Sequence, residues 1–198
     1  KMISARLGHR LDKPLAPLAQ HITLTGITPN FLTITGFIVS IAASASFILK
    51  TPKMAGILIL LSGGFDLLDG VVARTSGKVT AFGAFLDSLL DRYSDAMLFF
   101  GIGIYLIDNS FNVFLTALVF TGTFLISYVR ARAEGLGLTC NVGLMERPER
   151  IILLALGGIF NILLPVLWIL LIFTHFTVFQ RIYHTWLITR REKDKKDM

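Results

Sequence analysis

Long apolar stretches separated by short polar breaks run through most of the chain. Several of these stretches are close to the ~20 residues that a helix needs to cross a bilayer. The breaks carry turn and helix-start signals, such as Thr51-Pro52-Lys53 and Asp108-Asn109-Ser110. The pattern predicts six membrane-spanning helices, at about 30–50, 54–75, 81–107, 111–133, 147–160 and 164–184. The fifth is short, because Asn161 and Pro165 interrupt the apolar pattern.

Residues 3–23 are less apolar than a spanning helix. Their large aliphatic side chains recur at helical spacing, at Leu7, Leu11, Leu15, Leu18 and Ile22. Basic residues such as Arg6 and Arg10 lie between them, which is typical of a helix on the membrane surface. The expected fold is therefore an all-α integral membrane protein, with six transmembrane helices preceded by an amphipathic interfacial helix. Residues 1–198 are expected to form a single transmembrane domain.

The composition supports a polytopic membrane protein. Hydrophobic residues make up 54% of the chain and charged residues 16%, and the mean hydropathy of +0.69 is too high for a typical soluble domain. The net charge of +6 could indicate a nucleic-acid partner, but anchoring at the cytoplasmic membrane surface explains it better, so no nucleic acid is expected. The single cysteine, Cys140, excludes an internal disulfide and a multi-cysteine metal site.

The distribution of basic residues predicts the orientation in the membrane. Six spans place both termini and the loops at 76–80 and 134–146 on one side. All 19 Lys and Arg residues lie on that side except Lys50, Lys53 and Arg92. Since positive residues collect on the cytoplasmic side, the termini and these loops are expected to be cytoplasmic in a multi-pass protein of the cell membrane.

Four aspartates interrupt the second and third predicted spans. Asp66 and Asp69 share one helix face, and Asp87 and Asp91 share a face of the next helix. Both pairs lie near the cytoplasmic ends of their spans. If the two faces meet, four like charges converge, which is unfavourable without a cation. Oxygen ligands suit Mg²⁺, Mn²⁺ or Ca²⁺, so the sequence predicts a divalent metal site that cytosolic solutes can reach.

These aspartates belong to a longer spaced motif. It reads Asp66-x₂-Asp69-Gly70-x₂-Ala73-Arg74-x₈-Gly83-x₃-Asp87-x₃-Asp91. In these eight residues, without a departure, the chain resembles the CDP-alcohol phosphotransferase (CDP-alcohol phosphatidyltransferase) family, and the six-span layout is similar too. The resemblance implies a membrane enzyme in which an acceptor hydroxyl displaces CMP from a CDP-linked lipid. It also implies two ions of Mg²⁺ or Mn²⁺ and a homodimer.

The resemblance implies a role for each residue of the motif. The expected metal ligands are Asp66, Asp69, Asp87 and Asp91. Of these, Asp91 is also expected to be the general base that takes the proton of the acceptor hydroxyl. The residues expected to contact the CDP-lipid are Asp69, Gly70, Ala73, Arg74 and Gly83. Small residues allow the nucleotide to approach the backbone, and the guanidinium of Arg74 can bind phosphate through two hydrogen bonds.

Arginines at the cytoplasmic ends of three later spans point to the acceptor. Arg130, Arg150 and Arg181 lie at similar depth and could form a cationic pocket for a phosphate. Residues 127–134 and 146–150 resemble those of the phosphatidylinositol-phosphate synthase branch. This resemblance implies inositol 1-phosphate as acceptor and CDP-diacylglycerol or CDP-archaeol as donor. Glycerol 3-phosphate, the acceptor of phosphatidylglycerophosphate synthases, is the alternative, because the same arginines could bind it.

The same residues are compatible with two other classes of function. A divalent-cation transporter would use the same aspartates as an ion path. It would need them distributed through the membrane, whereas they cluster near one side, next to Arg74. A non-catalytic membrane scaffold would keep the motif for packing alone. Metal-dependent release of CMP from a CDP-lipid separates the phosphotransferase from both.

Overall fold

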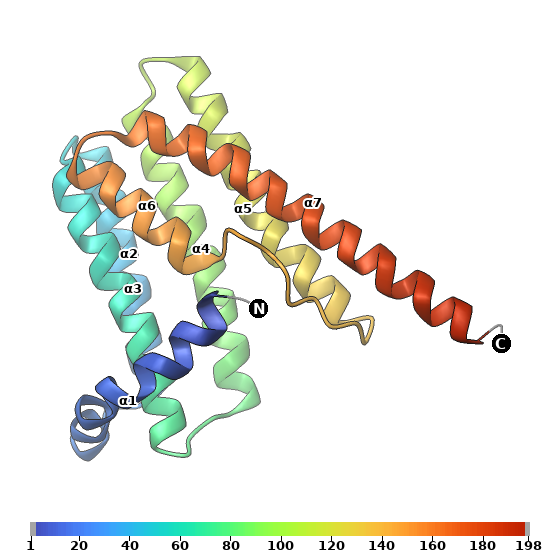
Figure 1. Cartoon of the computed structure of the whole chain (residues 1–198). Helices are drawn as coiled ribbons and strands as arrows, with labels where there is room; N and C mark the ends of the chain where they lie inside the picture. Colours follow the sequence, from blue (N-terminus) through green and yellow to red (C-terminus); the bar gives the residue numbers. More distant parts are fainter. Residues whose placement is uncertain (1–2, 197–198) are drawn as a thin grey trace.

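The computed structural model describes residues 3–196, and the side chains of residues 14–191. Its helices are α1 (Ile3–Leu24), α2 (Pro29–Ile48), α3 (Pro52–Thr75), α4 (Ala81–Tyr105), α5 (Ser110–Glu134), α6 (Arg147–Ile159) and α7 (Leu163–Lys196). Over residues 3–196 the secondary structure contains no strand, so the predicted all-α fold is confirmed. In Figure 1, α7 runs beside α5 and extends beyond the other helices to the C-terminus.

Local side-chain signals set where several helices begin. The hydroxyl of Thr80 accepts a hydrogen bond from the backbone N–H of Gly83, at 3.0 Å, in the first turn of α4. Asn109 caps α5 in the same way, accepting from the N–H groups of residues 111 and 112. Proline stands in the first turn of α2, α3 and α6, where its missing N–H costs nothing. The beginnings of the two helices that carry the aspartates are therefore local properties of the sequence.

Among the helices of the described residues, four are long and apolar enough to cross a membrane: α2, α3, α5 and residues Leu163–Arg191 of α7. The protein is accordingly a multi-pass membrane protein. Helix α4 has 25 residues but carries Asp87, Asp91, Arg92 and Asp95. Helix α6 has only 13 residues, which at 1.5 Å per residue gives roughly 20 Å, less than the thickness of a bilayer core.

The sixth predicted span ends at residue 184, whereas α7 continues to Lys196. The two ends differ because hydrophobicity predicts where a chain leaves the membrane and does not mark where a helix ends. The residues after Trp186 are mostly charged and contain no glycine or proline, so nothing in the sequence stops the helix.

Close crossing of α3 and α6 depends on glycines. A Cβ atom on Gly56 would lie 2.5 Å from the carbonyl oxygen of Ala155, and one on Gly158 would lie 2.6 Å from that of Pro52. Both contacts are too short for any side chain, so only glycine permits this approach. Small residues are common where helices pack within membranes. The crossing fixes α6 against α3 and so positions the first turn of α6 beside the aspartates.

Helix α2 connects the two aspartate-bearing helices through hydroxyl groups. Ser62 of α3 donates to the carbonyl of Gly36, at 2.9 Å. On the α4 side, Ser40 donates to Ser94 at 3.0 Å, and Ser44 donates to the carbonyl of Met97 at 2.6 Å. These bonds hold α3 and α4 against one common helix, α2. The aspartates of both helices then lie near the end of the bundle that carries the α3–α4 loop.

Candidate active site

The four aspartates come from the last turns of α3 and the first turns of α4. Asp69 is buried and accepts a hydrogen bond of 2.6 Å from the hydroxyl of Thr33 on α2. Its carboxylate also interacts electrostatically with those of Asp66 and Asp87. The structure therefore brings the acids of α3 and α4 near one another, as the spacing predicts, and α2 fixes the orientation of one of them.

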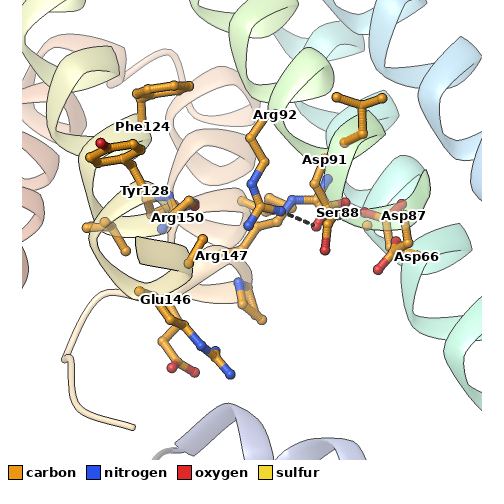
Figure 2. A pocket seen from close by; sticks show the side chains of 18 of the residues that line it. Asp66, Asp87, Ser88, Asp91, Arg92, Phe124, Tyr128, Glu146, Arg147 and Arg150 are labelled. Carbon is orange, nitrogen blue, oxygen red and sulfur yellow. Dashed lines mark hydrogen bonds and ion pairs between the residues drawn. The ribbon is translucent and has the colours of Figure 1, made fainter. Parts of the chain in front are cut away.

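Arg147, in the first turn of α6, lies among these carboxylates. One of its terminal nitrogen atoms, Nη1, forms ion pairs with both Asp66 and Asp91, the second at 2.7 Å. Its Nε atom lies 3.9 Å from Asp95. In Figure 2, Arg92, Arg147 and Arg150 lie on the side of Asp91 that faces away from Asp66 and Asp87. Acids from α3 and α4 thus share one positively charged nitrogen atom.

Two further arginines complete this charge network. Arg92 lies 3.3 Å from the second oxygen of Asp91. Arg150, one turn after Arg147, lies 3.3 Å from Asp95. Asp66, Asp91 and Asp95 therefore each have a guanidinium partner. These ion pairs offset the cost of holding like charges together in a poorly hydrated site.

The aspartates fit a hard divalent cation by their chemistry, because carboxylate oxygens are the ligands that Mg²⁺ and Mn²⁺ prefer. Asp66 and Asp91 already bind one common cation, the guanidinium of Arg147. In the part of the chain that the structure describes, no group of three or more His, Cys, Asp or Glu side chains is arranged to hold a metal ion. The guanidinium of Arg147 lies where Asp66 and Asp91 would share an ion.

The expected CDP-lipid residues lie where α3 ends and α4 begins. At Gly70 a Cβ atom would lie 3.1 Å from the guanidinium of Arg74. At Gly83 it would lie 2.9 Å from the hydroxyl of Thr80, so this first turn of α4 has no room for a side chain. Arg74 is exposed and Ala73 is half-buried. This group is continuous with Asp69 along α3.

A cavity of about 1060 Å³ opens between α3, α4, α5, α6 and α7. Asp66, Asp87 and Asp91 line one part of it. In Figure 2, Tyr128, Glu146 and Arg150 lie on the opposite side from Asp66 and Asp87. The basic residues that line the cavity are Arg92, Arg130, Arg147, Arg150 and Arg181. The cavity therefore has an acidic part and a basic part, as a site for metal and phosphates would need.

The three arginines expected to bind an acceptor phosphate all line this cavity. Arg130 is half-buried and pairs with Glu134 at 2.9 Å. Arg150 is buried and pairs with Asp95. Arg181 is also buried, and it donates to the backbone carbonyls of Val142 at 2.9 Å and Ile126 at 2.5 Å. Arg181 thus connects α7 to the loop before α6, and only part of its guanidinium remains for a ligand.

Several residues of the site were not among those predicted from the sequence. Arg147 carries the central ion pairs, yet as one arginine among several at helix ends it had no distinguishing spacing. Thr33 had no signal, since a hydroxyl on an apolar helix is common. Asp95 continues the i+4 series of Asp87 and Asp91, and that spacing could have identified it. Glu146 lines the cavity from just before α6.

Comparisons with known proteins agree with the geometry. The sequence profile of the CDP-alcohol phosphatidyltransferase family matches residues 26–186. The chain is 38% identical over 180 residues to an archaetidylinositol phosphate synthase of Pyrococcus horikoshii, covering 90% of this chain and 94% of that protein. It is 39% identical over 177 residues to a protein of the same name from Methanothermobacter thermautotrophicus, covering 86% and 87%.

The fold is similar to solved structures of the phosphatidylinositol phosphate synthase of Mycobacterium tuberculosis. The structure with CDP-DAG bound has a TM-score of 0.80 at 31% identity, covering 86% of this chain and 92% of that one. The structure in complex with manganese and citrate has a TM-score of 0.79 at 32% identity, covering 86% and 88%. The chain therefore belongs to the CDP-alcohol phosphatidyltransferase family.

Proposed function

We propose that the protein transfers a phosphatidyl group, or its archaeal equivalent, from a CDP-lipid to a hydroxyl of inositol 1-phosphate, with release of CMP. The observation that carries this proposal is one cavity that joins three aspartates of the family motif to three arginines. The aspartates are Asp66, Asp87 and Asp91, and the arginines are Arg130, Arg150 and Arg181. The names of the relatives support the choice of acceptor, since homologues are called archaetidylinositol phosphate synthase and phosphatidylinositol phosphate synthase. The CDP-DAG complex of the mycobacterial protein supports a CDP-lipid as donor.

In the proposed reaction, the acceptor oxygen forms a bond to the phosphorus that carries the lipid. The bond from that phosphorus to the oxygen of CMP breaks, and CMP leaves with the bonding electrons. Asp91 takes the proton of the acceptor hydroxyl. For this, one oxygen of Asp91 must leave its arginine partner, since Arg147 and Arg92 engage both oxygens in the structure.

The aspartates would hold the metal, with Asp66, Asp69 and Asp87 as ligands and Asp91 contacting a second ion. Bound Mg²⁺ or Mn²⁺ would neutralise charge on the pyrophosphate and on the leaving CMP. The manganese complex of the mycobacterial protein supports a divalent ion. Thr33 orients Asp69 through its 2.6 Å hydrogen bond.

The CDP-lipid would lie along the end of α3 and the start of α4. Its nucleotide would contact Asp69, Gly70, Ala73 and Gly83, where small residues let the backbone approach it. Arg74 would bind a phosphate through its guanidinium. The acceptor phosphate would lie in the basic part of the same cavity, within reach of Arg130, Arg150 and Arg181. The reacting hydroxyl would then face Asp91 across Arg147.

An acceptor panel tests this proposal. The purified protein, with CDP-diacylglycerol or CDP-archaeol and Mg²⁺ or Mn²⁺, is offered inositol 1-phosphate, inositol, glycerol 3-phosphate and serine, and CMP release is measured. We expect inositol 1-phosphate to give the highest kcat/KM, because a phosphorylated acceptor satisfies the arginines and the relatives are named for an inositol phosphate lipid. Turnover of inositol but not of its phosphate would refute the proposal. A preference for glycerol 3-phosphate would assign the alternative activity to the same site.

We also propose that α4 crosses the membrane with the other four helices and that the 13-residue α6 does so together with the segments next to it. We propose further that α1 lies at the interface and that the site faces the cytoplasm. The whole chain would then be one domain. The distribution of Lys and Arg supports this orientation. The apolar outer surface, where residues such as Phe100, Phe111 and Ile172 are exposed, supports the membrane crossings. We further propose a homodimer, which the mass of the detergent-solubilised protein would test.

Single cysteines test the orientation. Cys140 is completely buried, so it provides a low background for labelling with a membrane-impermeant maleimide. In intact cells we expect Lys53→Cys to be labelled, and Lys78→Cys to be labelled only after permeabilisation, because the two exposed positions lie at opposite ends of α3. Labelling of both variants in intact cells would contradict an odd number of crossings between them.

A further inference from the structure

Glu146 is a buried acid whose carboxylate lacks a hydrogen-bond donor. It stands immediately before α6 and is only 6% exposed. Neither of its carboxylate oxygens accepts a hydrogen bond from any of the side chains or backbone groups that the structure describes. The closest cation is Arg181, whose Nη2 atom lies 3.8 Å away, beyond hydrogen-bonding distance. Buried polar groups in proteins are nearly always bonded, so two unbonded oxygens on one side chain require an explanation.

The position of Glu146 in the cavity supplies that explanation. Glu146 lines the same cavity as Arg130, Arg150 and Arg181, on the side away from Asp66 and Asp87 (Figure 2). A phosphate bound to these arginines would be repelled by a neighbouring carboxylate. A hydroxyl group would instead donate a hydrogen bond to it. A site that combines arginines with an unbonded acid therefore suits a ligand that carries both a phosphate and hydroxyl groups.

We propose that Glu146 is a specificity-determining residue, which accepts hydrogen bonds from the hydroxyl groups of a phosphorylated polyol while the arginines hold its phosphate. The inference rests on the proposed function, because it takes this part of the cavity to be the acceptor site. It adds a reason for selecting a polyol with several hydroxyl groups over a simple phosphate. Glu146 takes no part in the proton transfer, which is assigned to Asp91.

A purely structural role would have a different consequence. In that case Glu146 serves only as a negative charge beside Arg181, which already donates to the carbonyls of Val142 and Ile126. Its loss would then loosen the loop before α6 and weaken binding of every anion in the cavity. Binding of hydroxyl groups, in contrast, predicts that a phosphorylated polyol is weakened and inorganic phosphate is not.

Glu146→Gln separates the two roles in the full-length protein. We expect the KM for inositol 1-phosphate to rise about tenfold, because hydrogen bonds to a charged group contribute about this much. The kcat and the KM for the CDP-lipid should change less than about threefold. Competitive inhibition by inorganic phosphate should stay the same or become stronger, since a nearby negative charge has been removed.

Two further variants make the test specific. Glu149→Gln removes the same charge one turn along α6, from a residue that does not line the cavity, and should leave all four constants unchanged. Glu146→Asp keeps the charge beside Arg181 but withdraws the carboxylate by one methylene. We expect it to raise the KM for inositol 1-phosphate as well, whereas a structural charge would be restored by aspartate. It also provides a charged variant if the glutamine variant does not fold.

The outcomes distinguish this inference from the function on which it rests. If the wild-type protein uses inositol 1-phosphate but Glu146→Gln leaves its KM unchanged, only the role of Glu146 is refuted. The role of Glu146 is also refuted if the KM for inositol 1-phosphate rises and inhibition by inorganic phosphate weakens together with it. If the wild-type protein uses no phosphorylated polyol, both the proposed function and the role of Glu146 are refuted. A raised KM with unweakened phosphate inhibition supports the inference.

Discussion

Replacing Asp91 with asparagine is expected to lower CMP release from CDP-diacylglycerol by about 10²- to 10⁴-fold, the usual contribution of a general base. Asparagine has the same shape but cannot take the proton of the acceptor hydroxyl. Asp91 lines the cavity, and its oxygens lie 2.7 Å from Arg147 and 3.3 Å from Arg92. The loss should appear in kcat with inositol 1-phosphate as acceptor, measured at saturating Mn²⁺.

Asp108→Asn is the matched control for this substitution. Asp108 is exposed, lies in the turn between α4 and α5, and pairs with Lys50 at 3.2 Å. It makes no contact with the cavity. The same change of chemistry there should leave CMP release unaltered. If Asp91→Asn retains activity within about threefold of the wild-type protein while it folds normally, another group must accept the proton.

The helical architecture was predictable because its signals are local. Apolar stretches of the right length specify α2, α3 and α5, and the caps at Thr80 and Asn109 lie in the sequence next to the helices that they start. The end of α6 was predictable for the same reason, since Asn161 takes a positive φ of 57° and breaks the helix. The end of α7 was not, because the charged residues that end its apolar stretch do not end the helix.

The part of the candidate site that depends on helix geometry alone was predictable. The i+3 and i+4 spacings predict that the acids of the two helices face each other, and in the structure Asp66 and Asp91 both form ion pairs with one common cation, the guanidinium of Arg147. The identity of that cation was not predictable. Arg147 is 81 residues from Asp66 in the sequence, and their contact depends on the crossing of α3 and α6 at Gly56 and Gly158.

The roles of the other arginines show a second limit of the sequence. Position at a helix end predicts on which side of the membrane a basic residue lies, but not which of its donors remain free. Arg181 donates to two backbone carbonyls, one of them in the loop at 135–146. The conformation of that loop depends on tertiary packing, so neither this bond nor the unbonded carboxylate of Glu146 could be inferred from residue spacing.

Arg147→Ala is expected to destabilise the metal-free protein by about 3–5 kcal/mol, the usual cost of removing one partner from a buried ion pair. Without the guanidinium, Asp66 and Asp91 would face each other with no shared cation, and Asp95 would keep only Arg150. Thermal unfolding in detergent with a chelator measures the effect. Arg132→Ala is the control, because Arg132 is exposed and does not line this cavity.

Added Mn²⁺ should restore most of the stability that Arg147→Ala loses, and it should stabilise this variant more than the wild-type protein. The reason is competition, because in the wild-type protein the ion must displace a guanidinium that already neutralises Asp66 and Asp91. Arg147→Lys, which keeps the charge, should behave more like the wild-type protein. If Mn²⁺ stabilises the alanine variant no more than the wild-type protein, the aspartates and Arg147 do not compete for one position. In that case the metal must bind without moving this arginine.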